Sequence, residues 1–148
     1  MQKFAHAARA TARLCIANAL SGANRPAREL VIPHCTYTDP EVAQVDLTSR
    51  GAREEDILID EYRLELAQVE RAFIDSEEEG FATIYTRRGS GEIVGATLVA
   101  AHACEMISEH TLPITRFMCW PRLSTAIRRR PRWGQGHQRR FREHQRQG

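Results

Sequence analysis

Residues 57–66 alternate between apolar and charged side chains, with Arg63 and Glu65 on the charged side. Because successive side chains of a strand point to opposite faces, the apolar positions of this stretch share the other face. The pattern predicts a half-buried strand of an antiparallel sheet. Its buried positions would be Tyr62, Leu64 and Leu66.

Two longer apolar runs, residues 81–87 and 92–100, flank the turn sequence RGSG at 88–91. Glycine lets a tight turn reach positive φ without a Cβ clash, so this arrangement predicts a β-hairpin. No helix follows the Gly-Ser-Gly segment, so it does not have the context of a phosphate-binding loop.

Upstream, the stretch from Leu30 predicts a short extended segment broken at Pro33 and a turn at Asp39-Pro40. A strand follows, in which alternate apolar residues share one face. Thr48 is a suitable N-cap for a short helix that begins at Ser49 and ends near Glu55. The shared apolar positions of the strand are Ala43, Val45 and Leu47.

Helical spacing replaces alternation at the start of the chain. Residues 2–20 are rich in alanine, contain no Gly or Pro, and are followed by Ser21-Gly22, a typical C-terminal cap. We therefore predict a helix with one buried stripe. The stripe would consist of Phe4, Ala8, Thr11, Cys15 and Asn18 or Ala19.

Residues 101–117 predict a second long helix. Pro113 lies inside this segment, where it removes one backbone hydrogen bond and clashes with the preceding turn at a cost of about 3 kcal/mol. We expect the helix to kink or end near Leu112. Its candidate buried positions are Met106, Ile107, Leu112 and Ile114.

These elements predict an α+β fold with an N-terminal helix and a mainly antiparallel sheet of about five strands that has helices packed on one side. The length of 148 residues suits one domain of ordinary size. We divide the chain into a helix at 1–22, a sheet domain at 23–118 and an irregular Arg-rich tail at 119–148.

Composition narrows the class of protein. Hydrophobic residues make up 42% and charged residues 27%, as in soluble globular proteins. No apolar run approaches the roughly 20 residues that a membrane span needs, and the N-terminus lacks the apolar core of a secretory signal. We expect a cytoplasmic protein with no membrane partner.

The net charge of +2 conceals a strong asymmetry, since residues 1–115 sum to −7 and residues 116–148 sum to +9. One interpretation of the tail is an out-of-frame translation of a GC-rich gene, which would explain its Arg, Pro, Trp, Gly and Gln bias. The other is a basic segment that binds nucleic acid, with Trp133 and Phe141 stacking on bases. We give nucleic-acid binding the smaller weight, because a run of charge is more often a solvated tail.

The four cysteines are separated by 20, 69 and 15 residues, which matches neither a zinc pair nor a close-spaced redox pair. We predict buried, inert thiols and no metal site. The acidic run from Asp75 to Glu79 predicts a solvated turn, because nothing in the pattern supplies metal-ligand geometry. The cysteines are Cys15, Cys35, Cys104 and Cys119.

Two stretches carry motifs that resemble a known family: IPHCTYTDPEVAQVDL at 32–47 and GEIVGATLVAAHACEMISE at 91–109. Both resemble the C-terminal dimerisation domain of the FAD-dependent pyridine nucleotide-disulfide oxidoreductases, in particular the mercuric reductase-like branch. The resemblance covers roughly Phe4 to Thr115. Asp46 stands where the family usually has glycine, a residue that permits close backbone approach.

The resemblance implies a parent enzyme that passes electrons from NAD(P)H through FAD to a redox thiol pair, and onward to a substrate such as mercuric ion. It also implies a homodimer through the sheet and the last helix. This sequence contains neither a Gly-rich nucleotide fingerprint nor a close-spaced dithiol. We therefore expect that the chain alone holds no cofactor and is inactive.

The family's "[FL]-T-H-x-A" motif approaches the flavin, and its matching residues here are Phe4, Ala5 and His6, with Ala5 in place of the usual Thr. These three are our candidate cofactor-binding residues; the alternative is a detached helix that packs on the rest of the domain. In the family a His-Pro motif and a following Glu act on the partner subunit's thiols. Here Gln138 follows His137, so we assign no catalytic residue.

We thus expect a detached dimerisation domain of this oxidoreductase family. Its partners would be a second copy, a full-length reductase whose activity it depresses, or a separately encoded FAD domain. The alternative function is a basic-tailed module that binds nucleic acid.

Overall fold

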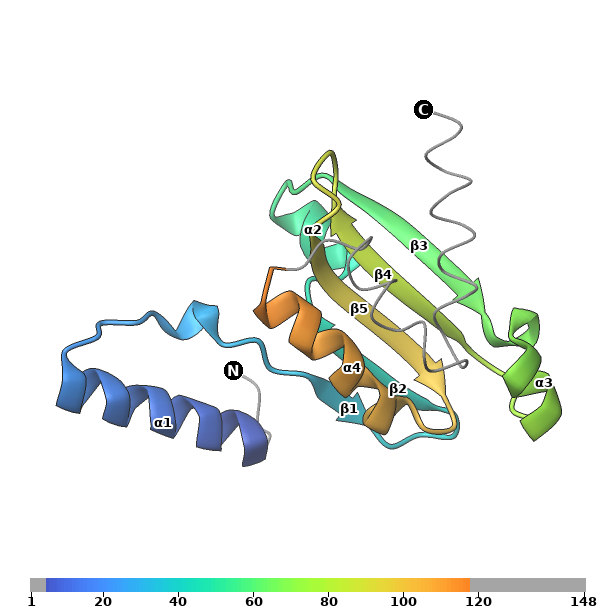
Figure 1. Cartoon of the computed structure of the whole chain (residues 1–148), viewed down its shortest axis with the longest axis horizontal. Helices are drawn as coiled ribbons and strands as arrows, with labels where there is room; N and C mark the ends of the chain where they lie inside the picture. The colour runs from blue at the N-terminus through green and yellow to red at the C-terminus, as the bar shows by residue number, and fades with distance from the viewer. Residues whose placement is uncertain (1–4, 118–148) are drawn as a thin grey trace.

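The computed structural model describes residues 5–117, so Phe4 and the tail at 119–148 lie outside the described part of the chain. Figure 1 shows a sheet crossed by one helix, with a second long helix beside the sheet. The helices are α1 (Ala5–Ser21), α2 (Ser49–Glu54), α3 (Glu70–Asp75) and α4 (Ala103–Thr115), with 3-10 turns at Ala27–Glu29 and Leu66–Gln68. The strands are β1 (His34–Thr36), β2 (Glu41–Asp46), β3 (Ile59–Glu65), β4 (Phe81–Arg87) and β5 (Ile93–Ala100).

The five strands form one sheet in the order β1-β2-β5-β4-β3, and every neighbouring pair is antiparallel. The α+β class and the five-stranded antiparallel sheet are confirmed. The β4–β5 hairpin is also confirmed, and its turn places Gly89 at φ +84° and Gly91 at φ +66°. On β3 the predicted apolar positions Tyr62 and Leu64 are buried, as is Leu66 just after the strand.

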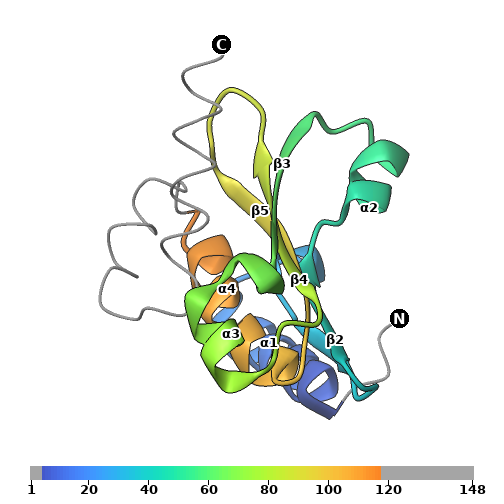
Figure 2. The same cartoon turned by 90° about the vertical axis from the view of Figure 1, so that its right-hand side faces the viewer.

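One face of the sheet packs against α4, which contacts β5, β2 and β1 (Figure 1). The central strands present several alanines on this face, so the helix can approach closely while larger side chains fill the remaining space. In Figure 2 α3 lies on the same side as α4, and α2 lies on the opposite side near one end of the strands. The core at this interface consists of Ala43, Val45, Ala82, Ile84, Ala96, Leu98, Ala103, Ile107 and Ile114.

A tight crossing follows β2. Asp46, which pairs with Gly95 of β5, has φ +56°, a left-handed conformation that glycine adopts most easily. The chain then passes over β5 so closely that a Cβ on Gly95 would lie 1.9 Å from the carbonyl oxygen of Leu47. Asp46 therefore occupies a glycine-type conformation, which explains why a glycine would suit this position. After the crossing, Thr48 caps α2 by accepting a hydrogen bond from the backbone N–H of Gly51, as predicted.

The N-terminal helix is present and ends at Ser21, but the predicted buried stripe is wrong. Ala7 and Leu14 are its buried residues, while Ala8, Thr11 and Cys15 are exposed. The buried face is rotated by one residue from the predicted one. Alanines occur on every side of this helix, so the sequence shows little difference in hydrophobicity between one face and another.

The helix α4 continues through Pro113 to Thr115, so it does not end near Leu112. Pro113 is almost fully buried and lies in the last turn of the helix. Ile107 and Ile114 are buried as predicted, whereas Leu112 is 62% exposed. Within residues 5–117, no helix combines the length and the apolar character that crossing a bilayer requires.

Candidate functional site

Among residues 5–117, no long helix lies across the face of the sheet opposite α4 (Figure 2). Side chains alternate along each strand, so the residues next to the core positions point to this side. Pairing places Val42 of β2, Val99 of β5 and Phe81 of β4 in one row across three strands. All three are half-buried. We call this surface the open sheet face.

The middle of the open sheet face is polar but shielded. Tyr85 donates a hydrogen bond from its hydroxyl to Thr97 Oγ1 at 3.2 Å. Thr83, which pairs with Thr97, is 1% exposed, and its hydroxyl finds no partner among the described residues. A buried hydroxyl without a hydrogen bond destabilises a fold by roughly 1–3 kcal/mol.

The edge of this face carries charge. The guanidinium of Arg63 on β3 lies 3.5 Å from the centroid of the Phe81 ring and also pairs with Glu65 at 2.6 Å. Cation–π contacts of this kind hold an arginine flat over an aromatic ring. The open sheet face thus combines a short apolar row, a polar centre and a positioned arginine, which is the mixed composition typical of a protein interface.

Perturbed acid–base groups lie at separate places. Burial lowers the pKa of His110 on α4, whose Nδ1 lies 3.4 Å from the carbonyl oxygen of Met106. Partial burial of its carboxyl group, followed by the charge of Glu55, raises the pKa of Asp46. Burial, followed by the charge of Asp60, raises the pKa of Tyr62. These groups belong to the helix core, the β2 crossing and β3, so they do not form an acid–base pair.

The cysteine prediction is wrong for three of the four residues. Cys35 and Cys104 form a disulfide with a Cα–Cα distance of 5.6 Å, across a sequence separation of 69 residues. Cys15 is a free and exposed thiol on α1. Cys119 lies outside the described residues. Spacing did not reveal the pair, because α4 crosses the sheet and brings its first turn above β1.

Glu41, the first residue of β2, lies beside the disulfide. Its carboxylate accepts a hydrogen bond from the backbone N–H of Cys104 at 2.9 Å. One ligand atom from each of Cys35, Glu41 and Cys104 lies within 4.8 Å of the other two. The sequence offered one signal for this group, the neighbouring Cys35 and Glu41, but the third member comes from a distant helix.

The candidate flavin-contacting residues lie at the start of α1. His6 Nε2 lies 2.6 Å from the carbonyl oxygen of Pro33, so the ring contacts the segment that precedes β1. Ala5 is exposed. His6 also borders a pocket of about 430 Å³ between α1 and α4, together with Cys35 and Cys104. The role of these residues toward a flavin stays a prediction.

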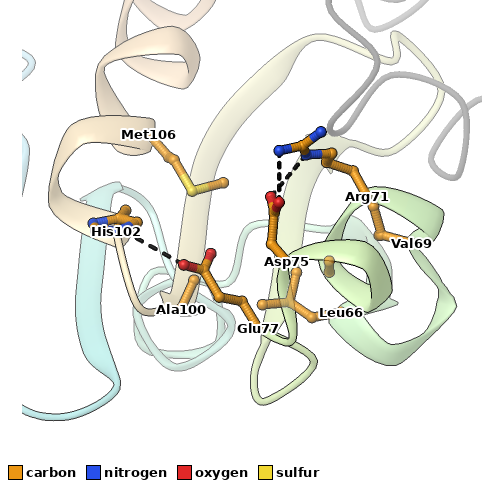
Figure 3. Close-up of a pocket in the computed structure, with 9 residues that line it drawn as sticks. Leu66, Val69, Arg71, Asp75, Glu77, Ala100, His102 and Met106 are labelled. Carbon is orange, nitrogen blue, oxygen red and sulfur yellow. Dashed lines mark hydrogen bonds and ion pairs between the residues drawn. The ribbon is translucent and has the colours of Figure 1, made fainter.

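A second pocket lies between α3 and the start of α4 (Figure 3). Its floor is apolar, and two contacts close its sides: the ion pair of Arg71 with Asp75, and His102 Nε2 at 3.6 Å from the carboxylate of Glu77. The volume is only about 40 Å³, enough for one or two waters. The acidic run singled out in the sequence therefore supplies ion-pair partners at a turn. The floor consists of Leu66, Val69, Ala72, Ala100 and Met106.

Residues 32–131 match the family model described as "Pyridine nucleotide-disulphide oxidoreductase, dimerisation domain". The chain belongs to this family. The match ends at residue 131, so the family resemblance extends further than the motifs up to Thr115 indicated.

Relatives with established names agree with this assignment. The chain is 32% identical over 112 residues to the mercuric reductase of Streptomyces lividans, which covers 76% of this chain and 24% of that enzyme. It is 32% identical over 119 residues to the dihydrolipoyl dehydrogenase of Bacillus subtilis, which covers 80% of this chain and 25% of that enzyme. The chain thus spans about a quarter of each of these relatives.

Solved structures share the fold. LpdA from Mycobacterium tuberculosis superposes with a TM-score of 0.74 at 22% identity, covering 87% of this chain and 29% of that one. The HOCl-induced flavoprotein disulfide reductase RclA from Escherichia coli superposes with a TM-score of 0.67 at 21% identity, covering 80% of this chain and 28% of that one. The sequence identification is therefore confirmed: this is a dimerisation domain of the flavin-dependent disulfide oxidoreductase type.

Proposed function

We propose that this chain forms a homodimer through the open sheet face, whereas α4, the other half of the expected interface, covers the opposite face of the sheet (Figure 2). The observation that supports the proposal is that a helix packs on only one of the two faces of the sheet. One face has a helix across it, whereas the other presents the half-buried row Val42, Val99 and Phe81. A twofold contact of one sheet face with its copy would supply the missing layer.

The parent reaction of this proposal is electron transfer from NAD(P)H through FAD to a thiol pair. The sequence of this chain contains no G-x-G-x-x-G fingerprint and no C-x-x-C pair. We propose that the chain on its own binds no flavin and oxidises no NAD(P)H, and that it acts by assembling with other units. Mercuric ion or dihydrolipoamide would be substrates of such a complete enzyme.

The division into parts is also a proposal. Residues 1–22 would form a helix belonging to the FAD-binding part, residues 23–118 the dimerisation domain and residues 119–148 a separate basic tail. α1 supports this division, because Ile16 and Leu20 are 59% and 84% exposed on it. Exposed aliphatic side chains on a helix suit contact with another domain. Phe4, Ala5 and His6 would then approach the flavin of a separately encoded FAD domain.

A full-length reductase is the second proposed partner. The same open sheet face would pair with the dimerisation domain of that enzyme and form a heterodimer, which would lower its activity because this chain lacks the family's His-Glu pair. The alternative of a nucleic-acid-binding module has no support, since the relatives and structures named above are oxidoreductases. The arginines on which it rests lie outside the described residues.

The test is the mass of the full chain in solution, measured by light scattering after size-exclusion chromatography. We expect a dimer for the unchanged chain and a dimer dissociation constant at least about tenfold higher for Val99→Asp, because the new carboxylate would have to be desolvated in the interface. Circular dichroism checks that the variant is folded.

Ile74→Asp is the matched control, because Ile74 is 69% exposed on α3, away from the open sheet face. It should leave the dimer intact. A monomeric unchanged chain, or equal weakening by both substitutions, would contradict the proposed interface. Mixing with a full-length family reductase, followed by native mass spectrometry, tests the heterodimer separately.

A further inference from the structure

We propose that Cys35 and Cys104, once their disulfide is reduced, form with Glu41 a binding site for a thiophilic divalent cation such as Zn²⁺. The site would be redox-controlled, because the disulfide form has no thiolate to offer. It is independent of the dimer proposed above, since it rests on the other side of the sheet and on different residues.

The geometry brings the three ligands together without rearranging the backbone. They come from three elements: β1, the first residue of β2 and the first turn of α4. Their ligand atoms lie within 4.8 Å of one another. Zinc binds thiolate sulfur at about 2.3 Å and carboxylate oxygen at about 2.0–2.2 Å in a tetrahedron, so its ligand atoms lie within about 4 Å of each other. Rotation of two cysteine side chains is sufficient to move from the disulfide to this arrangement.

The surroundings favour the anionic ligands that a cation needs. Cys104 is the second residue of α4, a helix of 13 residues whose N-terminal amides carry partial positive charge. A helix N-terminus stabilises a thiolate relative to a thiol. Glu41 is held in place by its 2.9 Å hydrogen bond from the Cys104 N–H. A carboxylate accepts several bonds through its two oxygens, so this contact leaves acceptor capacity for a cation.

The site is reachable from solvent. Both cysteines line the pocket of about 430 Å³ between α1 and α4, and both are half-buried. Three protein ligands leave one position of a tetrahedral ion open, and here that position would face the pocket. A small thiol could enter the same pocket to reach the disulfide.

The redox step balances with a small dithiol as the reductant. One thiolate of the dithiol attacks a cysteine sulfur, the Cys35–Cys104 bond breaks, and the second thiolate resolves the mixed disulfide. Two electrons and two protons pass from the dithiol to the protein, and the dithiol leaves as its own disulfide. Binding of Zn²⁺ then displaces the two protons of the protein thiols.

The experiment uses the full chain with Cys15→Ser and Cys119→Ser, which leaves only the two proposed thiols. The chain is reduced, freed of reductant without oxygen and titrated with Zn²⁺ by calorimetry. We expect one Zn²⁺ per chain and protection of both thiols from a thiol-modifying reagent. The same chain in its disulfide form should bind no Zn²⁺ at this site.

Co²⁺ gives a direct spectroscopic readout in the same chain, because thiolate coordination produces an intense charge-transfer band in the near ultraviolet. Adding Cys35→Ser or Cys104→Ser should abolish that band, and Glu41→Gln should weaken binding at least about tenfold. Circular dichroism of each variant confirms its fold. Equal binding by the disulfide form, or no Co²⁺ charge-transfer band in the reduced chain, would overturn the proposal.

Discussion

The two faces of the sheet are built from the same strands but differ in how deeply their side chains are buried. On the face toward α4, Leu98 and Ala96 of β5 are 0% exposed and pack on Ile107 and Ile114 of the helix. One residue further along the strand, Val99 points to the open sheet face and is half-buried. The first face stabilises the fold, and the second is the face of the proposed dimer interface.

This difference shows how a small domain divides its apolar surface. Burying apolar surface against a helix stabilises the fold by roughly 25 cal/mol for each Å² removed from water. Only every second residue of a strand points toward that helix. The alternate positions, which point to the open sheet face, include threonines and Tyr85. The Tyr85 hydroxyl donates a hydrogen bond to Thr97 within the sheet. Stability and association can therefore be changed separately, and the following substitutions test how far.

The largest effect should come from Leu98→Ala. Removing a fully buried leucine leaves a cavity under α4 and should lower the free energy of unfolding by about 3–4 kcal/mol. Val99→Ala is the matched control on the same strand and should cost about 1 kcal/mol or less. Urea denaturation measures both changes at a protein concentration that keeps the association state constant. Equal losses would show that the two faces contribute alike to folding.

Gly95→Ala should come next, at about 2 kcal/mol of destabilisation. The added methyl would meet the Leu47 backbone at 1.9 Å, so the crossing after β2 would have to move. Gly51→Ala is the control, because Gly51 lies within α2 and an added Cβ would meet only ordinary contacts at 3.5 and 3.6 Å. That change should be neutral or slightly stabilising, since alanine favours a helix over glycine. Thermal denaturation distinguishes the two outcomes.

Asp46→Gly should stabilise the chain by about 1 kcal/mol at neutral pH, because glycine adopts φ +56° without strain. Asp46→Asn separates charge from backbone, since asparagine keeps the side-chain shape but cannot ionise. The folded-state pKa of Asp46 is raised above 3.8. The folded state therefore binds more protons between those two pKa values, and the stability of the unchanged chain falls as pH rises through that window. The advantage of Asp46→Asn should grow over the same window in denaturation curves, and a constant difference would contradict the pKa assignment.

The smallest effect should come from His110→Gln. It should appear as a change in how steeply the free energy of unfolding depends on pH. Burial lowers the folded-state pKa of His110 below 6.5, so the unfolded chain binds more protons between the folded pKa and 6.5. The contribution of neutral His110 to stability is therefore complete above pH 6.5 and is lost as the pH falls toward the folded-state pKa. The glutamine side chain of this variant cannot take up that proton, so the variant should lose less stability on acidification. Parallel pH profiles for the two chains would show that His110 does not titrate on unfolding.

Local patterns predicted much of the sheet. The alternation in 57–66, the hairpin turn at 88–91 and the strand before Asp46 depend on neighbouring residues, and each appears in the structure at nearly the predicted place. The predictions that failed depended on surroundings. The stripe of α1 and the end of α4 near Pro113 were decided by what those helices pack against.

The sequence alone gave only part of the information about the candidate sites. The motifs identified the family and therefore the type of interface, but the open sheet face was recognisable only once the strand order was known. Cys35 and Cys104 were predicted to be buried, inert thiols, because sequence spacing detects only pairs that lie close together in the chain. Their approach requires β5 to lie beside β2 and α4 to cross back over β1.

The amino-acid sequence by itself determined which segments are strands or helices, the α+β class and the family, because these follow from side-chain periodicity and short motifs. Only the tertiary structure decided which sheet face stays uncovered, why Asp46 takes a glycine conformation and which cysteines meet. These features arise from contacts between residues far apart in the chain, and local propensity carries no information about such contacts.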